Sequence, residues 1–230
     1  MSICKINIFP SSLVGYIVYN QVYSIGLCNM MIGKSTMKGM IGVKICILSG
    51  TPKSKGLSHS VIKAAKQGVV EAGGQVDEVR LCDTEIERCK VCGNGWGACV
   101  TGECEYGDDG FNEIKERVKD SDAIIIASPV YWGETSEALK SFLDRLRRYD
   151  YHHKEVLVGK QVLLIAVAGG SGNGILTCLE QMERFCRHAN AYIFDYIGVN
   201  RWNNDYKKQA VKEASFALAS GRKNGDTVKY

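Results

Sequence analysis

Short apolar runs alternate with amphipathic segments along the chain from Val43 onward. Helical spacing of the apolar positions predicts helices over 58–74, 111–122, 134–149, 174–190 and 205–221. Between them, short apolar runs predict buried strands over 43–49, 123–129, 161–170 and 191–199, and apolar–polar alternation predicts a strand over 75–81. Regular alternation of strand and helix predicts an α/β fold, with a doubly wound five-stranded parallel sheet covered by helices on both faces.

Residues 1–42 do not share this pattern. They are apolar overall, but Asn7, Asn20, Gln21 and Asn29 interrupt them, so no run reaches the roughly 18–20 apolar residues of a membrane span. We expect an extension outside the fold, either accessory or upstream of the true start. A structured addition and a signal or anchor segment are the alternatives. Residues 43–230 are then the folded domain.

Composition narrows the function classes. The 230 residues are 45% apolar and 23% charged, with a formal net charge of +4. These values are those of a globular protein and exclude disorder. A small, dispersed positive charge predicts no nucleic-acid or membrane partner. Ten cysteines stand out, because a domain of this size needs no disulfides to hold its core.

Four of the cysteines gather in one segment, at about 86–110, after the second predicted strand. Cys89, Cys92, Cys99 and Cys104 have the spacing C-x2-C-x6-C-x4-C, and glycines between them let the chain curl. Four thiolates in one loop can bind an iron–sulfur cluster or a tetrahedral zinc ion. A segment without bound metal is the third reading. The other six cysteines stand mostly among apolar neighbours and are expected to be buried, reduced thiols.

Three loops follow strands at the expected ligand-binding edge of the sheet. Loop one, residues 49–58, offers hydroxyls, lysines and helix-start N–H groups that suit a phosphomonoester, and it lacks the Walker and dinucleotide glycine patterns. Loop two, residues 128–134, carries adjacent aromatic side chains that suit a flat ring. Loop three, residues 168–174, is so rich in glycine that backbone can approach a ligand closely. An ordinary capped turn, aromatic packing and a flexible loop are the respective alternatives.

Together, SGTPKSKGLS, SPVYWGETSEALKSFLDRL and AGGSGNG resemble the flavodoxin-like NAD(P)H-dependent FMN reductases, and among them the iron–sulfur flavoproteins. The resemblance covers about 43–220 and implies that loop one binds the FMN phosphate, loop two lies along the ribityl chain and ring, and loop three approaches the ring. The cofactor-binding residues are then Ser49, Thr51, Lys53, Ser54, Ser58, Pro129, Val130, Tyr131, Trp132, Gly133, Gly169, Gly170 and Ser171. Leu57 departs from the family, which has a polar residue there.

The same resemblance maps a 4Fe–4S cluster to Cys89, Cys92, Cys99 and Cys104. In the family the second and third cysteines are closer than in this chain, where GNGWGA separates them. We therefore expect a cytoplasmic, FMN-dependent oxidoreductase that passes electrons from NAD(P)H or a ferredoxin-type donor through FMN and the cluster to an acceptor, without a catalytic side chain. The resemblance implies a homodimer or homotetramer.

Two other functions remain open. The first is a plain NAD(P)H:FMN or quinone reductase whose cysteines are structural or bind zinc. The second is a non-catalytic electron carrier or redox sensor. No side chain is nominated as a general acid or base, and His152 and His153, in a polar stretch, are interpreted as solvent-exposed loop residues.

Overall fold

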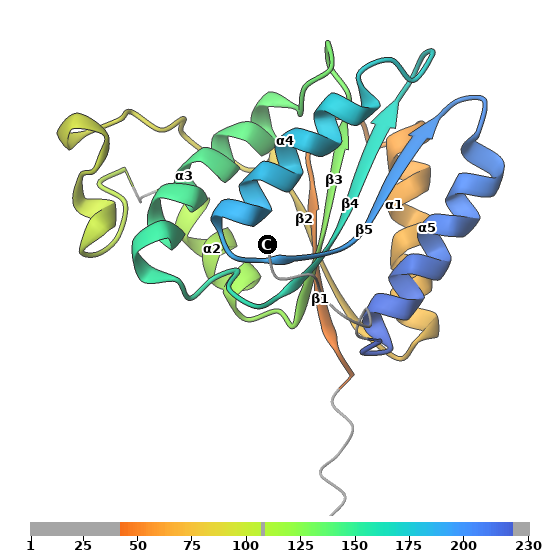
Figure 1. Cartoon of the computed structure of the whole chain (residues 1–230), viewed down its shortest axis with the longest axis horizontal. Helices are drawn as coiled ribbons and strands as arrows, with labels where there is room; N and C mark the ends of the chain where they lie inside the picture. Colours follow the sequence, from red (N-terminus) through yellow and green to blue (C-terminus); the bar gives the residue numbers. More distant parts are fainter. Residues whose placement is uncertain (1–41, 107–108, 223–230) are drawn as a thin grey trace, which may run out of the picture. The chain divides into compact units, whose positions relative to one another are not determined.

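A computed structural model describes residues 42–106 and 109–222 (Figure 1). The predictions for residues 1–42 concern a segment that, up to residue 41, lies outside the described residues. The described part contains one parallel sheet of five strands in the order β2-β1-β3-β4-β5. This order is that of flavodoxin-like doubly wound sheets, so the predicted fold class is confirmed.

The strands are those that the apolar runs predict, with ends shifted by one or two residues. They are β1 Lys44–Ser49, β2 Gln75–Arg80, β3 Ala123–Pro129, β4 Gln161–Ala168 and β5 Tyr192–Asn200. All seven residues of β3 are buried, as is typical of a central parallel strand covered on both faces. The β4–β5 pairing has a register shift between Val162 and Leu163.

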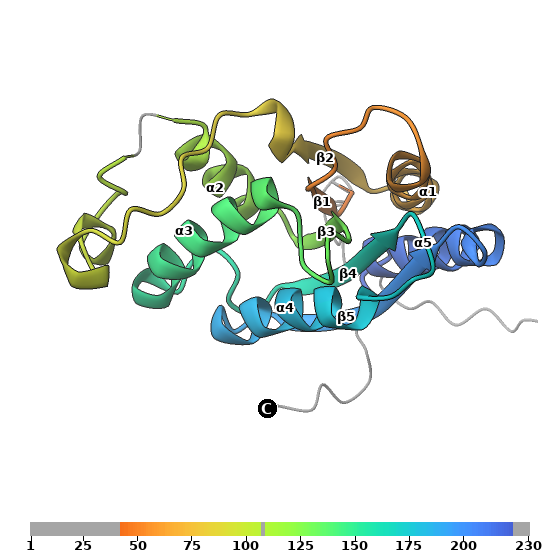
Figure 2. The same ribbon diagram turned by 90° about the horizontal axis from the view of Figure 1, so that it is seen from above.

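The helices are α1 Leu57–Glu71, α2 Phe111–Lys119, α3 Glu137–His153, α4 Ile175–His188 and α5 Asn204–Ala219. Two clusters of buried side chains divide them between the faces: α1 and α5 cover one face, and α2, α3 and α4 cover the other (Figures 1 and 2). On the first face, α1 and α5 pack closely at Gly68, where an added Cβ would lie 2.1 Å from the Lys212 carbonyl oxygen.

The predicted helix ends differ from the observed ones by up to four residues, and α3 differs most. The helix expected over 134–149 begins at Glu137 and continues to His153. Asp150 is buried in its last turns, and its carboxylate accepts hydrogen bonds from the N–H groups of Val156 (2.8 Å) and Leu157 (3.2 Å). These bonds satisfy the carboxylate inside the fold, so a stretch that looks like a polar loop is helical.

Among the described residues, no helix is both long enough and apolar enough to cross a membrane.

Candidate functional site

The sheet brings the three predicted ligand loops to one edge. Because β1, β3 and β4 are adjacent and parallel, loops one, two and three follow neighbouring strands at their carboxyl ends (Figure 1). Backbone hydrogen bonds connect the carboxyl ends of these strands. The Gly50 N–H donates to the Ala127 carbonyl oxygen at 2.9 Å, and the Val130 N–H donates to the Val167 carbonyl oxygen at 2.9 Å. The geometry is that of a ligand site at the switch point of an open sheet.

Loop one divides into a buried start and an exposed turn. Ser49 and Thr51 are buried, Lys53 and Ser54 are exposed, and Ser58 is half-buried in the first turn of α1. The Ser49 hydroxyl has no hydrogen-bond partner among the described residues. No side chain caps the start of α1, and its first turn carries no acidic residue. An uncapped helix start with hydroxyls beside it fits the phosphate of FMN.

Loop two turns sharply after β3. Pro129 ends the strand, and Tyr131 and Glu134 form a tight bridge through two backbone bonds of 3.0 and 2.9 Å. Between them Trp132 has φ +55° and a fully exposed side chain. A left-handed conformation is energetically costly for an aromatic residue. The backbone at Trp132 is therefore strained, and this strained turn directs the indole ring away from the core.

Loops two and three share a cavity of about 470 Å³, which is large enough for part of a ring system. Its lining includes six predicted residues: Val130, Trp132, Gly133, Gly169, Gly170 and Ser171. Gly169 and Gly170 have open space where a Cβ would stand. Backbone in this loop can therefore approach a flat ligand closely, as the FMN ring requires.

A second cavity, of about 670 Å³, continues from loop two toward the cysteine segment. Tyr131 and Trp132 line it at one end, and Arg88, Cys89 and Val91 line it from the cysteine segment. Glu134 and Thr135, which precede α3, and the residues of α3 from Glu137 to Arg148 contribute the rest.

One residue of α3, Arg145, holds both ends of the cysteine segment. Arg145 forms a buried ion pair with Asp109, donates to Glu87 O at 3.1 Å and donates to Tyr106 O at 3.0 Å. The Asp109 carboxylate also accepts the Glu87 N–H at 2.7 Å. The segment is thus a closed loop on the helix layer (Figures 1 and 2).

The tip of the segment rests on the last turns of α3. Arg148 donates to the Gly95 carbonyl and lies over the Trp96 ring, and Trp96 meets the His152 ring edge-on, with centroids 4.9 Å apart. His153 Nε2 lies 3.2 Å from the Cys99 carbonyl oxygen. The interpretation of His152 and His153 as loop residues was wrong, because the longer α3 includes both and carries His153 to the cysteine segment.

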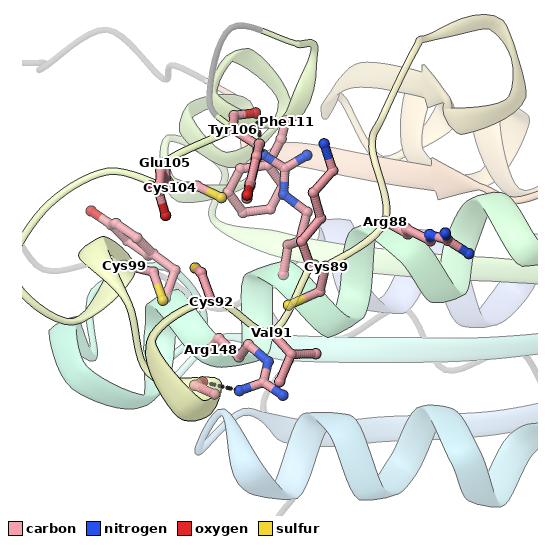
Figure 3. A pocket seen from close by; sticks show the side chains of 14 residues that line it. Arg88, Cys89, Val91, Cys92, Cys99, Cys104, Glu105, Tyr106, Phe111 and Arg148 are labelled. Carbon is pink, nitrogen blue, oxygen red and sulfur yellow. Dashed lines mark hydrogen bonds between the residues drawn. The ribbon is translucent and has the colours of Figure 1, made fainter.

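All four predicted metal ligands line one cavity (Figure 3). The buried Arg145 lines it too, as do Arg88 and Lys90 of the cysteine segment. Figure 3 shows Cys92, Cys99 and Cys104 directed toward a common space with Glu105, whereas Cys89 approaches from the Val91 side. Burial, and then Glu105, raise the pKa of Cys92 above its ordinary value.

The four thiols do not form a compact metal site in this structure. In the described part of the chain, no three His, Cys, Asp or Glu side chains are grouped to hold one metal ion. A 4Fe–4S cluster binds each cysteine to a different iron, so its ligands stand farther apart than those of one zinc ion. The cavity is about 20 Å³, close to the size of one water molecule. The described positions of the thiols therefore do not accommodate a cluster, and the 4Fe–4S assignment remains a prediction.

The remaining described cysteines are free thiols. Cys46, Cys178 and Cys186 are buried as expected, and burial raises the pKa of Cys46 to about 12 and that of Cys178 to about 11. Cys82 is exposed, so the packing prediction was wrong for it. Cys4 and Cys28 lie outside the described residues.

Sequence reasoning missed the polar residues that hold the site together. Arg145, Arg148 and Asp109 fasten the cysteine segment. Thr177 joins loops two and three through a 2.7 Å bond from its hydroxyl to the Gly133 carbonyl. The signal for Asp109 was local, an acidic residue two positions before a helix. The arginines had none, since their partners are far away in the chain.

Residues 43–202 match the family model of the NADPH-dependent FMN reductases. The chain belongs to this family. The match spans the sheet from β1 to β5 and includes all three ligand loops and the cysteine segment. FMN is thus the cofactor of the family to which the site belongs, and the individual contacts named above remain predictions.

Several of the proteins to which the chain is similar are iron–sulfur flavoproteins. One from Archaeoglobus fulgidus is 35% identical over 124 residues, covering 54% of this chain and 53% of that protein. One from Methanocaldococcus jannaschii is 30% identical over 146 residues, covering 62% of this chain and 71% of that protein. The chain therefore spans about half the length of the first relative and more of the second.

A solved structure has the same fold. The NAD(P)H:quinone oxidoreductase from Methanothermobacter marburgensis superposes with a TM-score of 0.59 at 18% identity, covering 77% of this chain and 97% of that one. At this identity the likeness concerns the fold.

Proposed function

We propose that the protein is an NAD(P)H-dependent FMN oxidoreductase that passes electrons through a 4Fe–4S cluster to an acceptor. Loop one would hold the FMN phosphate, and loops two and three would hold its ring. Cys89, Cys92, Cys99 and Cys104 would ligate the cluster. Bound FMN takes up a hydride as an electron pair, whereas the cluster transfers single electrons.

One observation carries the proposal: the cysteine cavity and the cavity at loop two have a common wall. Arg88, Cys89, Val91 and Arg148 line both. Trp132 in turn lines both the loop-two cavity and the cavity of loops two and three. The predicted ring site and the predicted cluster site are therefore separated by few side chains, an arrangement that serves electron transfer between them.

The chain's own residues would position the cofactors. Gly169 and Gly170 leave room for the ring, and the uncapped start of α1 offers N–H donors to the phosphate. Arg145 and Asp109 hold the ends of the cysteine segment together. Water exclusion and orientation, rather than a side-chain acid or base, are the protein's part in this chemistry.

Anaerobic purification tests the proposal directly. The visible spectrum, FMN content, and iron and acid-labile sulfide are measured together, before and after adding NADPH or NADH. We expect one FMN and about four irons per chain, with bleaching of both chromophores by the nicotinamide. Protein without flavin absorption after reconstitution with FMN would end the oxidoreductase proposal.

A cysteine variant separates the cluster from a plain flavin reductase. Cys89→Ser should lower iron content and stop electron flow to a one-electron acceptor, while hydride transfer to FMN continues. Cys82→Ser is the matched control, because Cys82 is an exposed thiol outside the cysteine cavity, and serine can keep the hydrogen bond that its side chain donates to the Gly50 carbonyl oxygen in loop one. Zinc without sulfide in the unaltered protein would favour the plain NAD(P)H:FMN or quinone reductase. Bound flavin without turnover would favour an electron carrier or redox sensor.

The proposal includes a homodimer or homotetramer, and a redox protein or small molecule as the other partner. Light scattering of the flavin-loaded protein measures the oligomer, and a monomer at micromolar concentration would contradict it. Cytoplasmic location and the absence of nucleic-acid and membrane partners remain predictions from composition.

A further inference from the structure

The cavity between loop two and the cysteine segment has room for a second molecule beside the predicted flavin site. Its volume is about 670 Å³, and small-molecule sites have volumes of roughly 300–1,000 Å³. The predicted ring site is a different cavity, between loops two and three, and Trp132 lines both. A molecule bound along α3 therefore reaches the place where the flavin ring is expected.

The loop-two end of this cavity is aromatic. Tyr131 and Trp132 line it, and both side chains are exposed. Exposed aromatic faces and edges suit contact with another flat ring. The turn at Trp132 holds its indole outward at a positive φ of +55°, so this surface exists before any ligand binds. A ring is the group expected at this end.

Charge changes sign along the cavity. Glu134 and Glu137 line it near loop two, and Arg147 and Arg148 line it in the last turns of α3. A rise of 1.5 Å per residue separates Glu137 from Arg148 by about 16 Å along the helix. Anionic groups of a ligand are repelled at the first end and attracted at the second. An elongated molecule with a ring at one end and anionic groups farther along matches this pattern.

Two arginines of this cavity lack partners within the described residues. Lys140 pairs with Asp144, and Arg148 donates to a backbone carbonyl of the cysteine segment. The side chains of Arg88 and Arg147 have neither an ion pair nor a hydrogen bond in that part of the chain. Arg88 comes from the cysteine segment and Arg147 from α3, so one stands on each wall. Guanidinium groups bind phosphate through paired N–H donors, so phosphate is the anion that they favour.

We propose that this cavity binds the nicotinamide co-substrate, that the cysteine segment forms its second wall, and that Arg88 and Arg147 bind the phosphate groups. The inference rests on the nicotinamide-dependent reaction of the proposed function, but not on the cluster. The nicotinamide ring lies against Tyr131 and Trp132. From there its hydride passes to bound FMN, so that NAD(P)H is oxidised to NAD(P)⁺ and the flavin is reduced.

Arg88→Gln and Arg147→Gln test the assignment, because each removes one guanidinium from one wall. Calorimetric titration of the flavin-loaded protein with NADP⁺ or NAD⁺ measures binding without turnover. We expect the Kd for NADP⁺ to rise at least about tenfold in each variant. The KM for NADPH should rise with it while kcat stays nearly the same, because phosphate contacts are equally strong before and during hydride transfer.

Arg184→Gln is the matched control for the lost charge. Arg184 is an exposed residue of α4 that pairs with Glu180, and it does not line this cavity. Its substitution should leave the Kd for NADP⁺ unchanged. In the two test variants, weaker binding of NADP⁺ alone assigns the arginines to its additional phosphate. Equal weakening with NAD⁺ assigns them to the phosphates that both molecules carry.

The results separate this inference from the proposed function. If the unaltered protein neither binds NADP⁺ or NAD⁺ nor is reduced by NADPH or NADH, the nicotinamide-dependent reaction fails, and the inference fails with it. If the unaltered protein is reduced but Arg88→Gln and Arg147→Gln keep its Kd and KM values, the inference alone is overturned. An equal loss of affinity in Arg184→Gln also overturns it, because net charge then accounts for the effect.

Discussion

The Thr177 hydroxyl, in the first turn of α4, donates a 2.7 Å hydrogen bond to the carbonyl oxygen of Gly133 in loop two. The same hydroxyl lies 3.0 Å from the Gly174 carbonyl oxygen, at the end of loop three. One side chain therefore joins the two loops that form the predicted ring site. The loops also touch directly, because a Cβ on Gly174 would stand 2.5 Å from the Gly133 Cα atom.

Gly174→Ala should push the two loops apart. Gly174 has φ +83°, and the added methyl group would collide with the Gly133 backbone and press on the Val130 side chain, 3.2 Å away. The left-handed backbone alone costs about 1–2 kcal/mol in a residue with a Cβ, and the contact adds to it. We expect a lower melting temperature and at least about a tenfold weaker FMN affinity, equivalent to about 1.4 kcal/mol. Fluorescence titration with FMN and thermal unfolding measure the two effects.

Gly73→Ala is the matched control for that variant. Gly73 also has a positive φ, +77°, but its Cβ would meet nothing within 4 Å, and it lies after α1, away from the ligand loops. It should cost stability without changing the FMN affinity. Equal FMN affinities in the two variants would contradict the role of the Gly133–Gly174 contact.

Gly169→Ala tests whether loop three approaches the flavin closely. Gly169 is exposed, and an added Cβ has open space around it in this structure. The substitution should therefore leave the melting temperature of the flavin-free protein nearly unchanged. If the flavin ring occupies that space, the methyl group competes with it, and the FMN affinity should fall by about tenfold or more. An unchanged affinity places the ring elsewhere.

The fold could be predicted because its signals are local. Continuous apolar runs such as 123–129 mark strands buried on both faces, and the apolar stripe at Leu139, Phe142 and Leu146 marks a helix on the sheet. The end of α3 could not be predicted in the same way. Tyr149 and Asp150 are polar residues that become buried only because Glu155 and the following backbone supply partners.

In the candidate site, too, local signals predict one part and distant contacts determine the other. The predicted residues of loops two and three meet in one cavity because strand order alone brings the loops together. The cysteine cavity depends on Arg145, whose partners Asp109 and Glu87 are 36 and 58 residues away. No local sequence pattern indicates that a charged residue beside an apolar helix face forms a buried ion pair. Secondary-structure propensity does not predict hydrogen bonds to partners far away in the chain either.

Acid should weaken the edge of the sheet at Asp77. Two hydrogen bonds from Arg117, at 2.5 and 3.2 Å, hold the pKa of the Asp77 carboxyl below its usual value. Stability from this pair is fully present above the unfolded pKa of about 3.9 and is lost as the pH falls through the lower, folded value. Asp77→Asn should cost about 1 kcal/mol at pH 7.

Urea unfolding of both proteins between pH 2 and 8 measures this difference. It should be constant from pH 6 to 8 and shrink below about pH 4, where the unfolded carboxyl takes up its proton. Asp83→Asn is the comparison: Arg80 also holds the pKa of the Asp83 carboxyl below its usual value, but Asp83 is more exposed than Asp77, so its effect on stability should be smaller. A difference that grows toward low pH would contradict the assignment.

Trp96→Ala should loosen the tip of the cysteine segment. Trp96 belongs to the GNGWGA stretch that separates Cys92 from Cys99, and it packs on Tyr151 and His152 with ring centroids 5.4 and 4.9 Å away. Each such aromatic contact is worth about 0.5–1.5 kcal/mol. The loss acts locally, so amide hydrogen exchange should accelerate over 89–104, while exchange in β3 and β4 stays unchanged.

Trp202→Ala is the control for that variant, because Trp202 follows β5 and its ring is largely exposed. If Trp96 serves to hold the longer spacing between Cys92 and Cys99 in a ligating arrangement, Trp96→Ala should also lower the iron bound after anaerobic reconstitution. Faster exchange with full iron content would mean that the cysteines order themselves around the metal. In that case the aromatic contacts stabilise only the unloaded segment.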